Sequence, residues 1–275
     1  MAEVLAATTA FVKAQQGKED VVQQWTETAW QPPPDVDAEV VESTARYAGV
    51  QLPGLSAFVG GVAAQEIVKL TGKYTPLRQW LYWDVFEALP KPEPAATFAP
   101  TGDRYEFSHV LFGADITKRV REQRVFLVGA GALGCEYLKS FAQAGVGTLG
   151  KGKITVTDMD NIETSNLNRQ FLFRNKDVGQ PKSVCGAAAA QAMNPDLQGR
   201  VVALEERVGA DTEDFFDDAF WGEVDLVVNA LDNVPARQYM DSRCVWYEKS
   251  LLESGTLGTK GNTMPIIARL TKTYN

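Results

Sequence analysis

Two cations and a carboxylate are the residues of this chain whose types and order point most directly to chemistry. Arg169 stands in the polar run "SNLNRQ", and Lys182 stands in "GQPKS" at a predicted helix start. Two such cations could neutralise the charge on a triphosphate and on its leaving pyrophosphate, which is what transfer of a nucleotidyl group requires. Taken singly, each is better interpreted as a solvated surface charge.

The carboxylate is Asp232, which closely follows the apolar run "VDLVVNA". If that run is a strand of a parallel sheet, Asp232 lies at the carboxyl edge, beside any nucleotide crevice. A lone carboxylate there suits Mg²⁺, which usually takes one or two protein carboxylates together with phosphate oxygens. The alternative is that Asp232 caps the helix that follows.

A glycine loop precedes all three residues. The stretch "VFLVGAGALG" places Gly129, Gly131 and Gly134 in a G-x-G-x-x-G pattern between a predicted strand and a predicted helix. Such a loop offers backbone N–H groups to a phosphate or ribose at a helix N-terminus, although it could also be only a tight turn. Asp158 ends the next predicted strand, "ITVTD", where a carboxylate can accept hydrogen bonds from ribose hydroxyls.

The loop and Asp158 alone leave an NAD-dependent oxidoreductase open. Hydride transfer has little need for an arginine and a lysine beyond the ribose, so Arg169 and Lys182 favour a different nucleotide. Together with Asp232 they favour ATP with Mg²⁺.

Short apolar runs alternate with helical stretches from about residue 103 to the end. We predict helices after the glycine loop, over 182–193 and over about 234–248, and strands at "VFLV", "ITVT", "VVAL" and "VDLVVNA". This alternation predicts an α/β domain, with a mostly parallel sheet and helices on both of its faces.

The first 102 residues have a different character. Residues 1–49 favour helix, with a break at the prolines of 31–35, and apolar residues at helical spacing predict a helix that begins at Pro53 and stops near Gly72. Gly60 and Gly61 inside it suggest close helix packing. The aromatic run 79–90 predicts a strand or buried segment, and the proline-rich run 90–102 predicts a linker.

Composition excludes some classes of function. The net charge of −8 argues against a nucleic-acid partner. No apolar stretch of about 18 residues predicts a membrane span, and we expect neither a signal peptide nor a membrane partner. Three widely separated cysteines with no CxxC pair fit a reducing compartment, and Cys135 and Cys185 are interpreted as buried core thiols.

Five motifs follow one another in the second half of the chain: "VGAGALGCE", "TDMDNIETSNLNRQFLF", "VGQPKS", "ALDNVPARQYMDSRC" and "LLESGTLGTKGNT". Together they closely resemble the active adenylation domain of ubiquitin-activating enzymes, which belong to the wider group of ThiF- and MoeB-like adenylating proteins. The resemblance covers roughly residues 104–275. It implies a Rossmann-like, ThiF-type fold.

An earlier segment, "AFVGGVAAQEIVKLTGKYTPLRQWLYWD", resembles the end of the inactive adenylation half of the same enzymes. The resemblance therefore implies three parts: a helical bundle segment over 1–49, the tail of the inactive half with a linker over 50–102, and the active adenylation domain over 103–275, incomplete on its C-terminal side. An inactive tail joined directly to an active half implies the single-chain arrangement of the ubiquitin type.

The resemblance also implies roles for individual residues. The glycine loop contributes Gly131 and Ala132, the latter as a backbone contact on the adenine side, and Asp158 binds the ribose. The resemblance assigns the phosphates and the magnesium ion to residues in the later motifs: Arg169 with Asn166 nearby, Lys182, Asp232 as the magnesium-linked carboxylate, and Asn233. A non-catalytic half would have no reason to keep all the charged members of this set.

The implied reaction is the ATP-dependent activation of ubiquitin by adenylation of its C-terminal glycine. The implied partners are the ubiquitin tail and, through domains outside this stretch, a ubiquitin-conjugating enzyme, in the cytoplasm and nucleus. The thioester-forming cysteine is expected in a further domain and not at Cys135, Cys185 or Cys244, so this stretch alone is expected to be incomplete for the full reaction. The alternatives are activation of another ubiquitin-like modifier and an NAD-dependent oxidoreductase.

Overall fold

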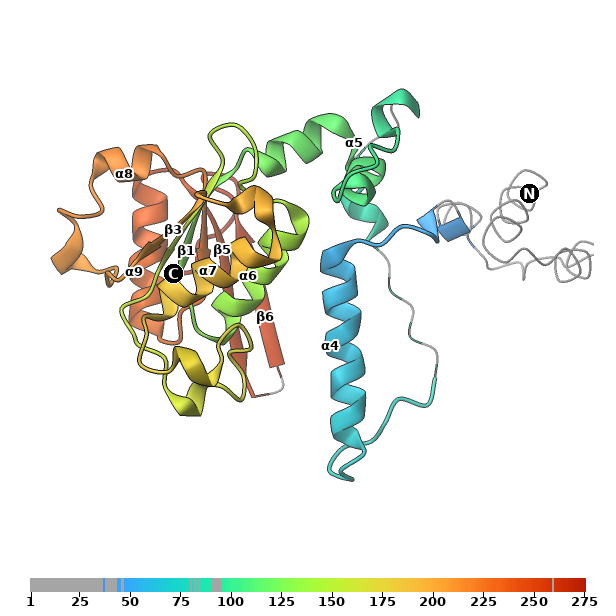
Figure 1. Ribbon diagram of the computed structural model, residues 1–275, viewed down its shortest axis with the longest axis horizontal. Coiled ribbons are helices and arrows are strands. Elements are labelled where there is room, and N and C mark those ends of the chain that lie inside the picture. The colour runs from blue at the N-terminus through green and yellow to red at the C-terminus, as the bar shows by residue number, and fades with distance from the viewer. Residues whose placement is uncertain are drawn as a thin grey trace, which may run out of the picture. The chain divides into compact units, whose positions relative to one another are not determined.

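The computed structural model describes residues 37, 44–45, 47–79, 81, 83, 85–90, 95–258 and 260–275 (Figure 1). The chain divides into two compact units, Met1–Gly113 and Ala114–Asn275. The division falls inside helix α5, Glu106–Arg121, where Gly113 has a positive φ of 78° and kinks the helix. Few residues other than glycine adopt this conformation without strain.

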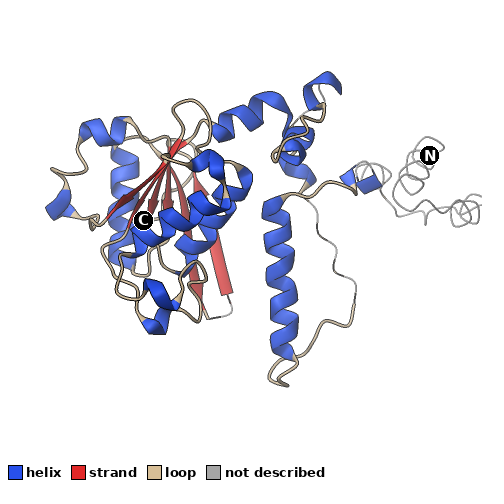
Figure 2. Cartoon of the chain, viewed as in Figure 1, coloured by secondary structure: helices blue, strands red, loops and turns tan. Residues whose placement is uncertain are grey.

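The second unit is built on one six-stranded sheet (Figure 2). The strand order is β3-β2-β1-β4-β5-β6; the first five strands pair in parallel, and β6 runs antiparallel to β5. This confirms the predicted α/β fold with a mostly parallel sheet. The strands are β1 Arg124–Val128, β2 Lys153–Thr157, β3 Val201–Leu204, β4 Leu226–Asn229, β5 Ser250–Leu257 and β6 Lys260–Ile266.

Helices cover both faces of this sheet, as the alternation of β1 shows. Val125 and Leu127 point into a core shared with α6 (Ala132–Ala144) and α7 (Lys182–Met193). Phe126 and Val128 point into the opposite core, shared with α8 (Asp218–Gly222) and α9 (Val234–Trp246). Figure 1 shows these two pairs of helices on either side of the strands. Each large apolar side chain buried this way contributes about 1.5–3 kcal/mol to folding.

Short 3₁₀ turns join these elements. They lie at Phe86–Ala88, Ala95–Phe98, Thr164–Asn166, Asn175–Asp177, Pro195–Leu197 and Ala210–Thr212. Among the described residues, no helix is both long enough and apolar enough to cross a membrane.

The first unit contains the predicted helix, α4, over Pro53–Lys69. Proline stands in its first turn, where the missing N–H costs nothing. The interpretation of Gly60 and Gly61 as close packing contacts is wrong for the described residues, because a Cβ built on either would meet no atom within 4 Å. None of the residues of α4 is buried. The glycines therefore lie on an open helix surface.

The strand or buried segment predicted for the aromatic run 79–90 is also wrong where the structure describes it, because Leu81 and Trp83 are exposed and none of the described residues of the run is buried. Leu81, Trp83 and Val85 lie outside any strand, and Phe86–Ala88 forms a 3₁₀ turn. A strand needs a neighbour for its backbone hydrogen bonds, and no described residue of the first unit lies in one. Instead, Trp83 stacks on Phe58 of α4 with ring centroids 4.3 Å apart.

Other predictions for the first 102 residues fall largely outside the described residues. These are the helical segment 1–49 with its proline break, and residues 91–94 of the predicted linker. The rest of that linker includes the 3₁₀ turn Ala95–Phe98. This turn lies against the kink of α5, because a Cβ built on Gly113 would lie 3.1 Å from the Thr97 side chain and 3.3 Å from the Phe98 side chain.

Candidate functional site

A cavity of about 1030 Å³ opens at the carboxyl edge of the sheet. Its walls come from the segments that follow β1, β2, β3 and β4, all within the second unit. Every residue nominated from the sequence lines this one cavity: Gly131, Ala132, Asp158, Asn166, Arg169, Lys182, Asp232 and Asn233. The parallel strands bring together groups as far apart in the chain as Gly131 and Asn233.

The three glycines of the loop have different structural roles. Gly129 has a φ of 101°, and a Cβ there would lie 2.6 Å from the Ala230 carbonyl oxygen. A Cβ on Gly134 would lie 2.3 Å from the Gly129 carbonyl oxygen, so this glycine permits close packing of α6 on the loop. A Cβ on Gly131 would meet only the Gln170 amide, at 3.8 Å. Gly131 thus leaves the wall of the cavity open to a ligand, directly before the first residue of α6, Ala132.

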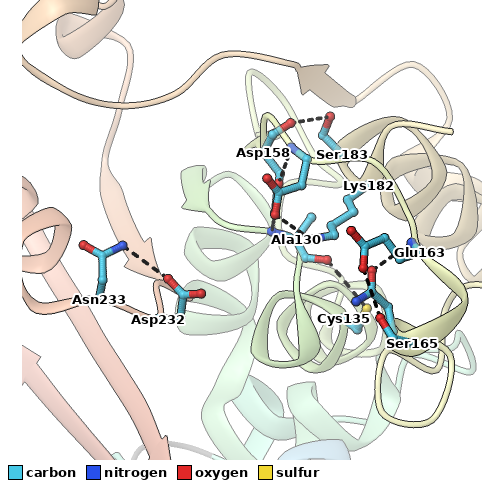
Figure 3. A network of polar contacts seen from close by, with 11 residues as sticks. Ala130, Cys135, Asp158, Glu163, Ser165, Lys182, Ser183, Asp232 and Asn233 are labelled. Atoms are coloured by element: carbon cyan, nitrogen blue, oxygen red, sulfur yellow. Dashed lines mark hydrogen bonds and ion pairs between the residues drawn. The ribbon is translucent and has the colours of Figure 1, made fainter. Parts of the chain in front are cut away.

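Asp158 follows β2 and is held by two backbone N–H groups (Figure 3). Ala130 N donates to Oδ2 at 2.7 Å, and Asp160 N donates to Oδ1 at 2.9 Å. Burial raises the pKa of this carboxyl above its usual value, while these two N–H groups and the Lys182 charge oppose the shift. Asp158 thus ties the end of β2 to the glycine loop that follows β1. Its side chain is fixed beside the loop before any ligand binds.

Lys182 is a buried cation with a carboxylate partner. Its side chain is 10% exposed, and Nζ lies 2.7 Å from Asp160 Oδ2. Its backbone N–H donates to the Asp160 carbonyl oxygen at 3.0 Å, which fixes the start of α7 against the β2 loop. A ligand phosphate at Lys182 would therefore compete with Asp160. The sequence nominated Lys182 but not Asp160, although the second aspartate of "DMD" was the available signal.

Asn166 and Arg169 come from the turn after β2. Asn166 is buried, and its Oδ1 accepts a hydrogen bond from Glu163 N at 3.0 Å, so part of its role is to shape this turn. Arg169 is exposed, and its Nη1 donates to Ser165 O at 3.1 Å and to Asn168 Oδ1 at 3.2 Å. These local contacts hold the guanidinium at the solvent side of the cavity.

Gln170 is a lining residue that the nominated set lacks. It is 4% exposed, and its Oε1 accepts no hydrogen bond from any residue that the structure describes. Buried polar atoms are rarely left without a partner, so an acceptor in the wall of a cavity is suited to a ligand donor. The polar run "NLNRQ" was the only signal for it.

Asp232 and Asn233 stand on the other side of the cavity, after β4 (Figure 3). Asn233 is the N-cap of α9, with Oδ1 accepting from Ala236 N at 2.9 Å. The alternative that Asp232 caps this helix is therefore wrong. Asn233 Nδ2 donates to Asp232 Oδ1 at 3.2 Å, and Asp232 itself is exposed to the cavity.

The donor set bears on whether a metal ion fits here. No group of three or more His, Cys, Asp or Glu side chains in the described part of the chain could form a closed metal site. The cavity does offer Asp232, with Asp158 and Asp160 on another wall. Because Mg²⁺ needs only one or two protein carboxylates when phosphates supply further oxygens, these residues fit an ion that arrives with a nucleotide.

None of the three cysteines lines the cavity. Burial raises the pKa of Cys135 to about 11 and that of Cys244 to about 12, and it raises the pKa of Cys185 as well. Cys135 is fully buried, as predicted. The same prediction is wrong for Cys185, which is only partly buried because it lies beside the stripe of α7 that faces the sheet.

Comparisons with known proteins identify the family of this chain. The model of the ThiF family matches residues 105–275. Ubiquitin-activating enzyme E1 1 of Candida albicans is 50% identical over 245 residues, which are 87% of this chain and 24% of that protein. Ubiquitin-like modifier-activating enzyme 1 of Homo sapiens is 49% identical over 245 residues, 88% of this chain and 23% of that protein. The chain thus spans about a quarter of the length of these curated relatives.

Solved structures give the same fold at lower identity. A crystal structure of E. coli MccB has a TM-score of 0.56 and 22% identity, covering 66% of this chain and 50% of that one. Another, of MccB with AMPCPP and SeMeT MccA, has a TM-score of 0.54 and 20% identity, covering 65% and 52%. At this identity the likeness supports the fold alone.

Proposed function

This chain belongs to the ThiF family, and on that premise we propose that it is the ATP-using adenylation part of a ubiquitin-activating enzyme. The observation that carries the proposal is the position of Arg169, Lys182 and Asp232 in one cavity with the glycine loop and Asp158. A hydride-transfer site would need the loop and the ribose carboxylate, but it would have little use for the two cations and Asp232 opposite them.

In the proposed reaction, the C-terminal glycine carboxylate of the modifier attacks the α-phosphate of ATP and pyrophosphate leaves. The glycine loop and Ala132 would bind the nucleotide through backbone groups, and Asp158 would hold the ribose. Arg169 and Lys182 would stabilise the charge that grows on the phosphates, with Asn166 keeping the turn before Arg169 in place. Lys182 would exchange its Asp160 partner for a phosphate oxygen.

A magnesium ion bound with ATP would neutralise phosphate charge. Asp232 would hold it, and Asn233 would keep Asp232 in place from the start of α9. The proposed step needs no side chain as a covalent nucleophile, in keeping with the raised pKa values of all three cysteines. The proposal includes ubiquitin as the modifier, a ubiquitin-conjugating enzyme as the later partner, and a cytoplasmic and nuclear location, as for the enzymes that the chain resembles.

The test is modifier-dependent exchange of pyrophosphate into ATP, measured on the protein at its full natural length. We expect exchange with ubiquitin and none without a modifier. Exchange only with another ubiquitin-like modifier would replace ubiquitin as the substrate but keep the chemistry. Absence of exchange with every modifier would overturn the proposal.

A second measurement uses the 275-residue chain itself and separates adenylation from hydride transfer. Its thermal unfolding is followed with ATP and Mg²⁺ and, in parallel, with NAD. A nucleotide at about 100 times its Kd stabilises the folded state by about 2.7 kcal/mol. We expect this protection from ATP and Mg²⁺ only, and stronger protection by NAD would favour an oxidoreductase.

A further inference from the structure

A buried ion pair joins a residue of the cavity wall, Arg237, to Glu253 behind it, close to the loop that carries Asp232. Arg237 Nη1 of α9 lies 3.0 Å from Glu253 Oε1 of β5, and the two side chains are 16% and 4% exposed. Removing two charges from water costs about as much as their attraction returns. Such a pair is therefore weak as a stabilising device, and its position suggests another role.

The other arm of the guanidinium holds the loop. Arg237 Nη2 donates to the Leu231 carbonyl oxygen at 2.5 Å, and Leu231 immediately precedes Asp232. Arginine suits this arrangement because its planar fork can direct one nitrogen to a carboxylate and another to a carbonyl. Lysine has a single nitrogen and could not reproduce the geometry.

The anchor behind Arg237 is itself fixed to the sheet. Glu253 Oε2 accepts a hydrogen bond from Asn229 Nδ2 at 2.6 Å, and Asn229 is the last residue of β4. Burial raises the pKa of Glu253, while the Asn229 amide and the Arg237 charge lower it. These contacts connect the end of β4 to Glu253, Glu253 to Arg237, and Arg237 to the loop that follows β4.

The neighbouring strand leaves room for this guanidinium. A Cβ built on Gly255 would lie 2.3 Å from Arg237 Nη1 and 2.7 Å from Nη2. Glycine at this position of β5 therefore creates the slot in which the fork lies. Asn233, which directly follows Asp232, is fixed as well. Its side chain caps α9, and its backbone carbonyl oxygen accepts a hydrogen bond from Arg237 N at 3.3 Å.

We propose that Arg237, anchored by Glu253, is a positioning residue that sets the Asp232 carboxylate for a nucleotide-bound magnesium ion. The inference rests on the proposed function for the nature of the ligand. Its physical basis is that Asn229 and Leu231, which precede Asp232, are tied to Glu253 and to the Arg237 side chain. The start of the helix after Asp232 is tied to the Arg237 backbone.

The test compares Arg237→Lys with Arg243→Lys in the protein at its full natural length. Arg243 lies on the same helix and pairs with Glu213 at 3.1 Å, but it does not line the cavity, so it is a matched control. Binding of a fluorescent ATP analogue is measured in EDTA and across a Mg²⁺ titration, beside thermal unfolding. Residues that orient a metal ligand typically change metal affinity or activity by about 10–100-fold.

For Arg237→Lys we expect nucleotide binding in EDTA to stay within about two-fold of the unsubstituted protein, and the Mg²⁺ needed for half-maximal effect to rise about ten-fold or more. Exchange should lose kcat by up to about a hundred-fold with little change in the KM for ATP. Glu253→Gln should shift the Mg²⁺ requirement in the same direction, because it keeps an oxygen for Asn229 and removes the charge that anchors Arg237. Arg243→Lys should shift neither quantity.

Two results would overturn the proposal. If Arg237→Lys weakens nucleotide binding in EDTA as much as in Mg²⁺, Arg237 contacts the nucleotide directly. If it lowers the unfolding temperature but leaves the Mg²⁺ requirement unchanged, the pair is only structural. The Mg²⁺ titration needs no modifier, so it tests the role of Arg237 even if pyrophosphate exchange fails. Failure of exchange would count against the proposed function, whereas an unchanged Mg²⁺ requirement would count against the role of Arg237.

Discussion

Asp232 and Asn233 are adjacent and nearly the same size, yet the fold gives them separate tasks. Asn233 donates to Asp232 and accepts from the first turn of α9, whereas the Asp232 carboxylate faces the cavity. An Asp-Asn pair at a helix start is ambiguous in a sequence because either side chain can cap. The hydrogen bond that Ala236 N donates to the Asn233 side-chain oxygen shows that Asn233 is the cap.

The two tasks predict opposite effects of alanine. Asp232→Ala should abolish pyrophosphate exchange, with a loss of at least about a hundred-fold, because a charge that stabilises the reacting phosphates is removed. Its unfolding temperature should hardly change. Asn233→Ala should cost about 1 kcal/mol of stability through the lost cap and should retain measurable exchange. Exchange assays and thermal unfolding of the two purified variants check this, and full activity of Asp232→Ala would contradict the assignment.

The sequence predicted much of the site because each nominated residue belongs to a short motif that follows a strand. The sequence did not predict roles for Asp160, Gln170 and Arg237, and the reasons differ. Asp160 lies two positions after Asp158, and Gln170 directly follows Arg169. Only the three-dimensional structure shows that Asp160 contacts Lys182 and that Gln170 lies in the cavity wall. Arg237 acts through Glu253, and nothing local in the sequence indicates that a residue of α9 pairs with a residue of β5.

At the scale of elements, the site depends on how closely β1, the glycine loop and α6 approach one another. Gly134 is in contact with the loop backbone, and Gly131 is beside open space. Gly134 is therefore expected to matter for the stability of the fold, and Gly131, three positions earlier, for nucleotide binding.

Alanine at the two positions should have distinct effects. Gly134→Ala places a Cβ 2.3 Å from the Gly129 carbonyl oxygen, and we expect destabilisation on the order of 1–3 kcal/mol, as for other overpacked sites. Gly131→Ala should fold normally and lose about ten-fold or more in nucleotide affinity, about 1.4 kcal/mol. Denaturant unfolding and titration with an ATP analogue measure the two effects. Normal affinity in Gly131→Ala would place the nucleotide away from this loop.

The elements of the second unit were predictable where the periodicity was clear. The runs "VFLV", "ITVT", "VVAL" and "VDLVVNA" are short and apolar, and each overlaps an observed strand. All but "VVAL" form strands that are buried on both faces; "VVAL" forms the edge strand β3, in which Val202 is exposed. The hairpin of β5 and β6 escaped prediction because much of it is exposed and polar, and β6 also contains a proline. The first half of β5 is held in place by its parallel pairing with β4, which the sequence of β5 does not indicate.

At the scale of the molecule, the two units differ in how they are stabilised. The second has two buried cores on either side of one sheet. Helix α4 of the first unit buries none of its residues, and Ile67 and Leu70 are 66% and 80% exposed. A helix that buries none of its residues gains little from tertiary packing beyond the contact of Phe58 with Trp83, and it retains little more than its marginal intrinsic stability.

Hydrogen exchange on the 275-residue chain should therefore differ between two helices of similar length. We expect amides of α4 to exchange at least about ten-fold faster than those of α6, because α4 opens without disrupting a core. ATP with Mg²⁺ should slow exchange in α6, beside the nucleotide loop, and leave α4 unchanged. Mass spectrometry of peptides from both helices measures this in one sample, and equal protection would contradict the description of α4 as a helix with no buried residues.

Cys135 lies in the first turn of α6, and its thiol points back to the Ala130 carbonyl at 3.9 Å, away from the cavity (Figure 3). In the proposed reaction, an activated acyl group would form a few residues from this sulfur. A thiolate there would react with the activated acyl group and leave the enzyme acylated on a cysteine that cannot pass the group on. Burial leaves the sulfur protonated at neutral pH and inaccessible, so in the proposed reaction the fold would suppress this side reaction and keep the activated modifier for its intended acceptor.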